Sequence, residues 1–439
     1  MWGRQGAGRS WLGSLFASLP VVLGPIGSVV VFIILAAFEG SLCSFVTAVA
    51  KEGLYTIFAK YRPQLTARGV FAVAGWIGWQ ALLFQYLPGK IRTGQVTPAG
   101  HILAYRMNGL SAWFVTHLVW IALCWLGILD PAFIPRNWSG LVAAMNLGGV
   151  LVAAFAFVKA YASPTHPDDR KFSGSSIYDF YMGIEFNPRF GRDFDFKLFN
   201  NGHLGMMVWT LIDFSNMAYQ YQTLGHVKPS LILLTILQTI YVLDFFVNEA
   251  WYLATIDIEH DHYGFYLAWG CICFLPTMYT IQAQYMGLYP TSPSSAYLTM
   301  VFAIGLAGYA VFRSVNNQKD RARRLGPGHQ CYIWGKPAEF IVAPYTTSNG
   351  TQRTNLLLCS GWWGWSRHAN YVGDLVFSYS TCALVGLGSG AVVWTYAIFM
   401  TILLVHRCKR DEKRLEGKYG DAWAEYCRRV PWRLVPGIW

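Results

Sequence analysis

Polar side chains recur along an otherwise apolar segment near the middle of the chain. Residues 229–256 are apolar enough to cross a membrane, yet they carry a polar stripe made of Gln238, Tyr241, Asp244, Asn248, Glu249 and Tyr252. At 100° per residue, the stripe falls within about 140° of arc on one face of a continuous helix. An acidic side chain in mid-membrane costs about 2.5–3.5 kcal/mol to insert, so the stripe should face a cavity or other helices. Interhelical hydrogen bonds that fix a helical bundle are the simpler explanation.

The segment directly after the stripe, Asp257 to His262, is unusually rich in titratable side chains. Two of them, His260 and His262, are of a type that binds zinc. Their alternate spacing suits neither face of a helix, and no third ligand is evident beside them. We therefore do not predict a metal site here.

Basic residues gather in two further segments. After the apolar segment 294–315, the six positions 319–324 hold four of them: Lys319, Arg321, Arg323 and Arg324. If the last apolar helix continues outward, one face of about 120° holds Arg407, Asp411, Leu415, Lys418 and Tyr419. Lys and Arg side chains bind phosphates, Arg in bidentate fashion.

Aromatic side chains close to these charges offer flat surfaces to a planar ring: Trp363, Tyr371, Tyr419 and Tyr426. With the cations, they predict a dinucleotide site with enough positive charge for an additional 2′-phosphate. The alternative is that the charges hold the topology and contact lipid headgroups. The glycine cluster 386–390 lies between two apolar segments without a preceding strand, so it predicts a turn and not a phosphate-binding loop.

Membrane helices must position these residues. Of the 439 residues, 54% are hydrophobic, 13% are charged and 19 are Trp, which indicates a polytopic membrane protein. A helix of roughly 20 apolar residues crosses the hydrocarbon core. We predict an all-α membrane protein with ten spans, at 12–38, 69–87, 109–129, 141–163, 203–221, 229–256, 265–286, 294–315, 371–387 and 390–406. Asn349-Gly350 adds a small cytosolic β-hairpin, and a helical C-terminal tail breaks near Gly420.

The net charge of +11 follows the loops of this topology. With ten spans both termini share one side, which the positive-inside rule makes cytosolic. All but six of the 34 Lys and Arg residues then lie on the cytosolic side, so the charge does not indicate nucleic acid. We expect a single integral membrane domain over 1–439, with four N-terminal spans in 1–163, central spans in 164–315, and a cytosol-facing cofactor part in 316–439.

Several long blocks resemble a known family. They are LPGK at 87–90, GIEFNPRFGRDFDFKLFNNGHLGMMVW at 183–209, YVLDFFVNEAWYLATIDIEHDHYGFYLAWG at 241–270, SGWWGWSRHANYVGD from Ser360, and the tail from His406. Over residues 87–439 the chain is similar to the sterol reductases of the endoplasmic reticulum, which reduce ring double bonds with NADPH. It looks most like the Δ7 branch, because FNNGHLGMM and IDIEHDHYGFYLAWG differ from what the Δ14 branch carries there.

The resemblance implies ten helical spans with two connected pockets, one open to the cytosol for NADPH and one open to lipid for the sterol. The sterol-side pocket is expected among the central spans 164–315. Carried over by motif, the NADPH-binding residues are Lys319, Arg323, Leu358, Trp363, Arg367, His368, Asn370, Tyr371, Arg407, Asp411, Leu415, Glu416, Gly417, Lys418, Tyr419 and Tyr426. Arg367 and His368 are expected to orient the motif. Leu415-Glu416 departs from the family pattern, which puts the contact of Glu416 in doubt.

The expected reaction is ionic, because an isolated olefin is a poor hydride acceptor. An acid protonates one carbon and NADPH delivers hydride to its neighbour. Tyr241 is the predicted proton donor, and Asp244, Glu249, Asp257 and Asp411 are predicted to relay protons or to shape the field around the transient cation.

Three other functions compete with a Δ7-reductase. They are a sterol Δ14-reductase, a non-catalytic sterol-binding membrane protein, and an enzyme like the isoprenylcysteine methyltransferases, whose RHANY-type motif is similar but whose chains are shorter. The expected partners are a sterol delivered from the bilayer and membrane lipids, with other sterol-pathway enzymes as a further possibility. The expected location is the endoplasmic reticulum membrane, with several passes.

Overall fold

The structure is a computed structural model that describes residues 11–326, 330–346, 350 and 352–439. Its chain folds into two compact units. The first contains Met1–Pro293 and Val385–Val393, and the second contains Ser294–Leu384 and Trp394–Trp439. The division into 1–163, 164–315 and 316–439 stays a prediction.

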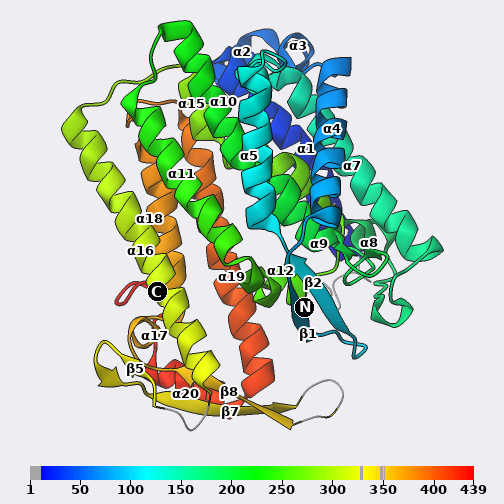
Figure 1. Cartoon of the computed structure of the whole chain (residues 1–439), viewed down its shortest axis with the longest axis vertical. Helices are drawn as coiled ribbons and strands as arrows, with labels where there is room; N and C mark the ends of the chain where they lie inside the picture. Colours follow the sequence, from blue (N-terminus) through cyan, green and yellow to red (C-terminus); the bar gives the residue numbers. More distant parts are fainter. Residues whose placement is uncertain (1–10, 327–329, 347–349, 351) are drawn as a thin grey trace. The chain divides into compact units, whose positions relative to one another are not determined.

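Long helices dominate the first unit (Figure 1). They are α1 (Trp11–Ala37), α4 (Ala67–Tyr86), α5 (Gly109–Trp125), α7 (Trp138–Ala162), α10 (Met207–Leu224) and α11 (Pro229–Val247). Between α1 and α4, α2 (Leu42–Glu52) and α3 (Leu54–Tyr61) form a pair bent by 115°. Gly53 lies at the bend with φ 86°, a value that favours glycine.

Short helices fill the rest of this unit. They are α6 (Phe133–Arg136), η2 (Pro167–Asp169), α8 (Ser176–Met182), α9 (Phe196–Leu198), η3 (Phe199–Met206), η4 (Glu249–Ala254), α12 (Ile256–Glu259), α13 (Phe265–Trp269), η5 (Gly270–Phe274), α14 (Leu275–Met278) and α15 (Ile281–Leu288). The segment predicted as a span at 265–286 is therefore not one regular α-helix. The π-helix η5 and a turn at residues 279–280 interrupt the α-helix. In addition, the hydroxyls of Thr277 and Thr280 donate to carbonyls of the preceding turn, and such bonds bend a helix.

Two hairpins of the first unit were not predicted. Strands β1 (Lys90–Val96) and β2 (Ile102–Met107) pair antiparallel, and β3 (Arg189–Phe190) pairs with β4 (Phe194–Asp195). The second hairpin belongs to the segment 164–202, which lies between two of the predicted spans. This segment is well packed, because Glu185, Asp195 and Lys197 are buried within it.

The second unit consists of α16 (Ser295–Leu325), α17 (Trp362–Trp365), α18 (Ala369–Ala383), α19 (Thr395–Tyr419) and α20 (Asp421–Arg429), with two small hairpins and the end of η6 (Ala391–Trp394). Helices α16 and α18 lie side by side (Figure 1). A Cβ at Gly308 would stand 2.8 Å from the Phe377 nitrogen, and one at Gly373 would stand 2.5 Å from the Phe312 nitrogen. These two glycines therefore allow the close approach of the two helices.

The predicted β-hairpin and tail are confirmed in the second unit. Strands β7 (Phe340–Thr346) and β8 (Gln352–Leu358) pair antiparallel from Phe340↔Leu358 to Thr346↔Gln352, and Asn349 of the predicted turn lies outside the described residues. A smaller pair, β5 (Tyr332–Ile333) and β6 (Lys336–Pro337), precedes them. Helix α19 continues to Tyr419, breaks at Gly420 with φ 49°, and α20 restarts at Asp421, as predicted.

Six helices of the described residues are long and apolar enough to cross a membrane, or seven if the bent pair α2–α3 counts as one span. They fall at 13–37, 67–86, 138–162, 229–247, 295–325 and 391–419. Helix α5 is apolar but shorter, and α18 has only 15 residues. The protein is therefore a helical membrane protein with small hairpins, and the predicted count of ten spans is not confirmed.

Candidate functional site

The polar stripe of the first unit is divided between two elements. Helix α11 ends at Val247, because the Asn248 amide bonds back to the carbonyl and carboxylate of Asp244 and its backbone leaves the helical region. Glu249 and Tyr252 follow on the 3-10 turn η4. The prediction of one continuous helical face from Gln238 to Tyr252 is therefore wrong beyond Val247.

Tyr241 and Asp244 remain together on α11, less than one turn apart. The ring of Tyr241 packs against Trp209 of α10, with 5.8 Å between ring centroids, and Trp209 in turn contacts Tyr279 edge-on. Nearby, Gln238 is fully buried and donates to the Tyr279 carbonyl and to Gln282. Gln238 thus has the interhelical bonding role that was the simpler explanation of the stripe.

Glu249 lies apart from this pair and is buried at the start of α5. Its Oε2 accepts a hydrogen bond of 3.0 Å from the Gly109 N–H, while Oε1 has no partner among the described residues. Burial raises the pKa of the Glu249 carboxyl to about 7, against the lowering effect of the Gly109 N–H. The group can therefore hold a proton near neutral pH.

The segment after the stripe folds around a buried lysine that sequence reasoning missed. The ammonium of Lys197 donates to the carbonyls of Asp257, Ile258 and Asp261 at 2.7–3.0 Å. Burial lowers the pKa of Lys197 to about 8, and the carboxylates of Asp195, Asp261 and Asp257 oppose the shift. Asp257 itself is half-buried. The FDFKLF block carried a signal for this site, because a lysine among buried aromatics needs partners.

The two histidines of the segment have separate surroundings. His260 pairs with Glu259 at 3.4 Å, and His262 is buried edge-on against Phe186. In the part of the chain that the structure describes, no three His, Cys, Asp or Glu side chains form a group able to hold a metal ion.

In the second unit, Lys319 and Trp363 form one contact of the predicted cofactor site. The Lys319 ammonium lies 4.5 Å from the centre of the Trp363 ring, and the indole N–H donates to the Val315 carbonyl. Trp363 is buried in an apolar cluster with Leu358, Ile333 and Ala369. Arg323 follows Lys319 by one turn of α16 and is exposed, so the two cations share a face.

Arg367 and His368 are held by the tail. Their backbone N–H groups donate to the carbonyls of Trp432 and Arg433. The Arg367 guanidinium pairs with Glu412 at 2.8 Å, and Arg433 pairs with the other oxygen of the same carboxylate at 2.7 Å. Glu412, which we did not predict, therefore ties α19 to both segments, and the tail helps to orient the RHANY motif.

The start of α18 carries polar atoms without partners. His368 stacks on Tyr371 with ring centroids 5.1 Å apart, and its Nε2 has no hydrogen-bond partner among the described residues. Burial lowers the pKa of His368 to about 4, with Asp411 opposing. The Asn370 amide donates weakly to Asn316 at 3.4 Å, while its Oδ1 also lacks a partner among the described residues. Buried atoms of this kind ordinarily bond to a ligand or water.

The remaining predicted cofactor residues lie along α19 and on α20. Asp411 pairs with Arg414 at 3.3 Å. Arg407 and Leu415 are half-buried, whereas Glu416, Gly417 and Lys418 are exposed. The Lys418 ammonium lies 4.0 Å from the centre of the Tyr345 ring of β7. The helix therefore holds charged groups at its surface, next to the hairpin.

Two tyrosines predicted to stack on a planar ring are instead buried in protein. Tyr419 and Tyr426 pack in one apolar cluster with Ala343, Trp423 and Val430. The Tyr419 hydroxyl accepts from Asn355, and the Tyr426 hydroxyl donates to the Trp363 carbonyl. Because packing occupies both rings, the structure does not support a stacking role for them. Tyr371 is half-buried, so part of its ring surface remains accessible.

Comparison with known proteins gives a consistent result. The model of the ergosterol biosynthesis ERG4/ERG24 family matches residues 21–439. The chain is 42% identical over 449 residues to a 7-dehydrocholesterol reductase of Xenopus laevis, covering 98% of this chain and 94% of that one. It is 44% identical to a 7-dehydrocholesterol reductase of Danio rerio (88% and 82% covered). A Δ14-sterol reductase of Methylotuvimicrobium alcaliphilum is 35% identical (99% and 96% covered).

Proposed function

Because this chain belongs to the ergosterol biosynthesis ERG4/ERG24 family of sterol reductases, we propose that it reduces the Δ7 double bond of a Δ5,7-sterol with NADPH. Identity favours this branch, since the two vertebrate 7-dehydrocholesterol reductases are 42–44% identical and the Δ14-sterol reductase is 35% identical. The protein would act in the endoplasmic reticulum membrane with both termini in the cytosol.

The second unit supplies the observation that most supports the cofactor. Unsatisfied polar atoms of His368 and Asn370 lie at the start of α18, and Asn370 contacts Asn316, one turn before Lys319 on α16. Cations on that face of α16 suit phosphate groups, and amide and imidazole atoms suit the polar edges of a nucleotide. These residues fit a dinucleotide, with Lys319 and Arg323 on phosphates and Asn370 with Tyr371 on a ring.

When bound, NADPH supplies the hydride. Tyr241 gives its hydroxyl proton to one carbon of the double bond, which leaves a cation on the neighbouring sterol carbon to accept the hydride. A tyrosine with a pKa of about 10 is a weak acid, so its proton must be replaced quickly. Asp244 lies beside it on α11 and is the first relay group, while Asp257 and Glu249 are the more remote candidates. Asp411 of α19 is assigned to the cofactor site.

Two variants test these roles separately. We expect Tyr241→Phe to lose at least 100-fold in turnover, because general acid catalysis contributes 10²–10⁴-fold, while NADPH binding stays within twofold. We expect Asp411→Ala to raise the NADPH concentration needed for half-maximal rate. Turnover is measured by mass spectrometry of sterol products from reconstituted membranes, and binding by NADPH fluorescence. Wild-type turnover of Tyr241→Phe would remove it as the donor, and unchanged NADPH affinity of Asp411→Ala would count against its cofactor role.

A further inference from the structure

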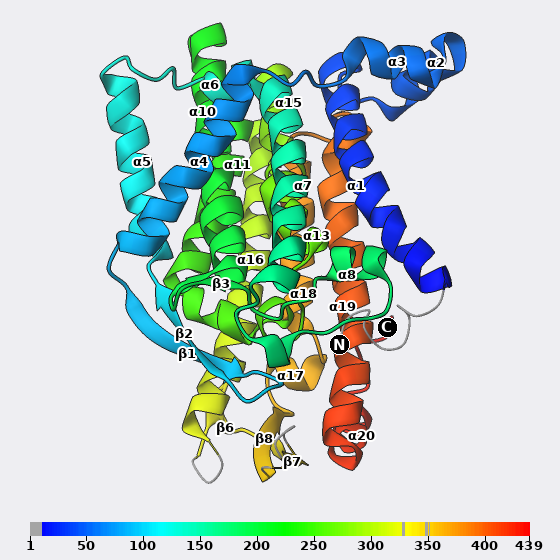
Figure 2. The same cartoon turned by 90° about the vertical axis from the view of Figure 1, so that its right-hand side faces the viewer.

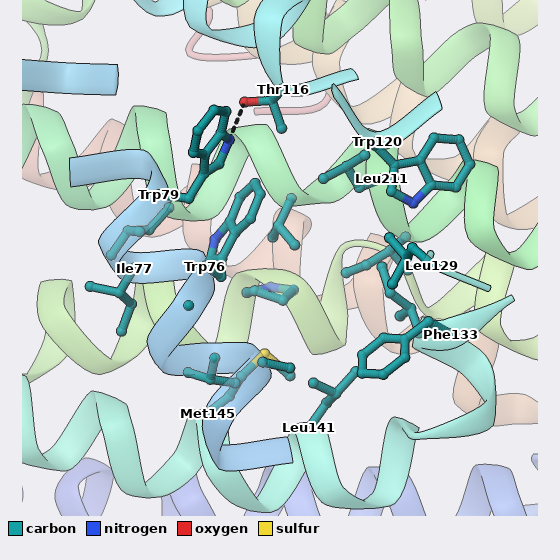
Figure 3. A pocket seen from close by; sticks show the side chains of 18 of the residues that line it. Trp76, Ile77, Trp79, Thr116, Trp120, Leu129, Phe133, Leu141, Met145 and Leu211 are labelled. Carbon is teal, nitrogen blue, oxygen red and sulfur yellow. Dashed lines mark hydrogen bonds between the residues drawn. The ribbon is translucent and has the colours of Figure 1, made fainter. Parts of the chain in front are cut away.

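A large apolar pocket lies in the first unit. Its volume is about 660 Å³, within the range of sites for small organic ligands. Its walls come from α4, α5, α6, α7 and α10, together with η3, η5 and α14. Figure 3 shows the rings of Trp76, Trp120 and Phe133 projecting into this space from three different helices.

The pocket occupies the angle between α4 and α5. These helices meet at one end and diverge towards the other (Figure 2). At the closed end, the Asn108 amide donates to the carbonyls of Leu83, Phe84 and Leu87 and thereby joins the two helices. The outer surface of α5 is strongly apolar, with Leu118 63% exposed. Because such a surface faces hydrocarbon in a membrane, the diverging helices give a membrane lipid a lateral way in.

One hydroxyl marks the closed end. Thr116 Oγ1 accepts hydrogen bonds from Trp79 Nε1 at 3.3 Å and from Gln80 Nε2 at 2.9 Å. The described residues provide no acceptor for the Thr116 proton, and the fully buried Gln80 has no partner for its Oε1. A polar pair at this depth without its full set of bonds is costly, since no water is present in hydrocarbon. A ligand hydroxyl beside Thr116 would accept the missing bond.

We propose that this pocket binds a sterol that is not the one undergoing reaction. The flat indole and phenyl rings suit a rigid fused-ring body, which loses little conformational entropy on binding. Thr116 is the one lining residue that carries a hydroxyl, and its place at one end matches the single hydroxyl of a sterol. A flexible acyl chain needs neither feature.

The pocket is separate from the predicted proton donor. Val208, Leu211 and Ile212 line it from α10. The side chain of Trp209 projects from a different side of α10 and contacts Tyr241. Tyr241 is not among the lining residues. A sterol in this pocket is therefore a second ligand, suited to sensing or storing membrane sterol.

Two glycines of α4 give a matched pair of variants for the test. A side chain added at Gly75 or at Gly78 meets nothing within 4 Å, but only Gly75 lines the pocket. The full-length protein is reconstituted and labelled with a cholesterol analogue that carries a diazirine and an alkyne, and labelled peptides are mapped by mass spectrometry. We expect labelling of residues 72–79 and 116–123, reduced at least fivefold by Gly75→Phe and less than twofold by Gly78→Phe. Equal labelling in the two variants would overturn the proposal.

The hydroxyl is tested by competition against the same probe. Unlabelled cholesterol should displace the probe about tenfold better than its 3-deoxy analogue, the effect of one hydrogen bond at about 1–1.5 kcal/mol. Thr116→Val should remove this preference; if that variant fails to fold, the preference is measured on the wild type, where its absence would contradict the role of Thr116. A phosphatidylcholine probe with a diazirine group is tested in the same way. If it labels the same peptides and cholesterol does not displace it, the pocket is an acyl-lipid groove and the proposal is wrong.

Sterol binding in this pocket is tested separately from the catalytic proposal, whereas its assignment as a second, non-reacting site rests on the proposed role of Tyr241 as proton donor. Labelling should be the same with and without NADPH, and Tyr241→Phe should not change it. A chain that fails to reduce sterols but labels as expected would refute the proposed function alone.

Discussion

Charged residues are handled differently in the two units. The first unit encloses matched ion pairs: Lys159 and Glu185 are 6% and 3% exposed and 3.0 Å apart, and Arg189 and Asp195 are 3% and 0% exposed and 3.2 Å apart. In the second unit basic residues outnumber acidic ones six to three over residues 407–418, and many are half-buried or exposed. Charges in the first unit therefore fix the fold, while those in the second leave a positive surface suited to an anionic cofactor.

The largest expected effect on stability comes from removing one partner of a buried ion pair in the first unit. Lys159→Met leaves the Glu185 carboxylate buried without its cation, and we expect a loss of about 3–5 kcal/mol in stability. Thermal unfolding of the detergent-purified protein measures it. The double variant with Glu185→Gln keeps an acceptor for the Thr165 N–H and should recover at least half of the loss. A single variant as stable as the wild type would show that the pair is not structural.

Glu412 extends the comparison, because it is a mostly buried acid of the second unit that pairs with two arginines. Glu412→Gln weakens its pairs with Arg367 and Arg433 and should cost about 2 kcal/mol. The matched control is Glu425→Gln, which alters the surface pairs with Arg428 and Arg429 and should leave the melting temperature unchanged. Similar melting temperatures for both variants would mean that Glu412 behaves as an ordinary surface acid.

His368 makes a smaller contribution to the stability of the second unit, and this contribution depends on pH. Because burial lowers its pKa to about 4, the unfolded chain binds more protons than the folded chain between pH 6.5 and 4. Stability is therefore complete above pH 6.5 and falls as the pH drops through this window, by about 1 kcal/mol between pH 7 and 5.5. His368→Gln should flatten that part of the curve of melting temperature against pH. An unchanged slope would place the titrating group elsewhere.

The sequence predicted the six long apolar helices and the break in the charged tail, because both depend on local composition. Helix α19 and its break at Gly420 follow from apolar spacing and one glycine. The end of α11 at Asn248 was missed, since it depends on whether a side-chain amide bonds back to the Asp244 backbone. Such competition between local bonds leaves no trace in hydrophobic periodicity.

The candidate site was predictable only in part. Basic residues at 319–324 and 407–418 stood out by their charge, but the burial of Tyr419 and Tyr426 depends on β7, which lies far away in sequence. Lys197 and Glu412 were missed for the same reason, because their partners come from distant segments. Contacts of this kind are set by tertiary packing, which composition does not encode.

The most direct test of the account is a competition between substrates. Purified, reconstituted protein receives equal amounts of a Δ5,7-sterol and a Δ14-sterol with NADPH, and products are identified by mass spectrometry. We expect the Δ7 bond to disappear first, with one NADPH oxidised for each sterol reduced and little reaction with NADH. Preferential reduction of the Δ14-sterol, or no NADPH consumption with either sterol, would contradict the account.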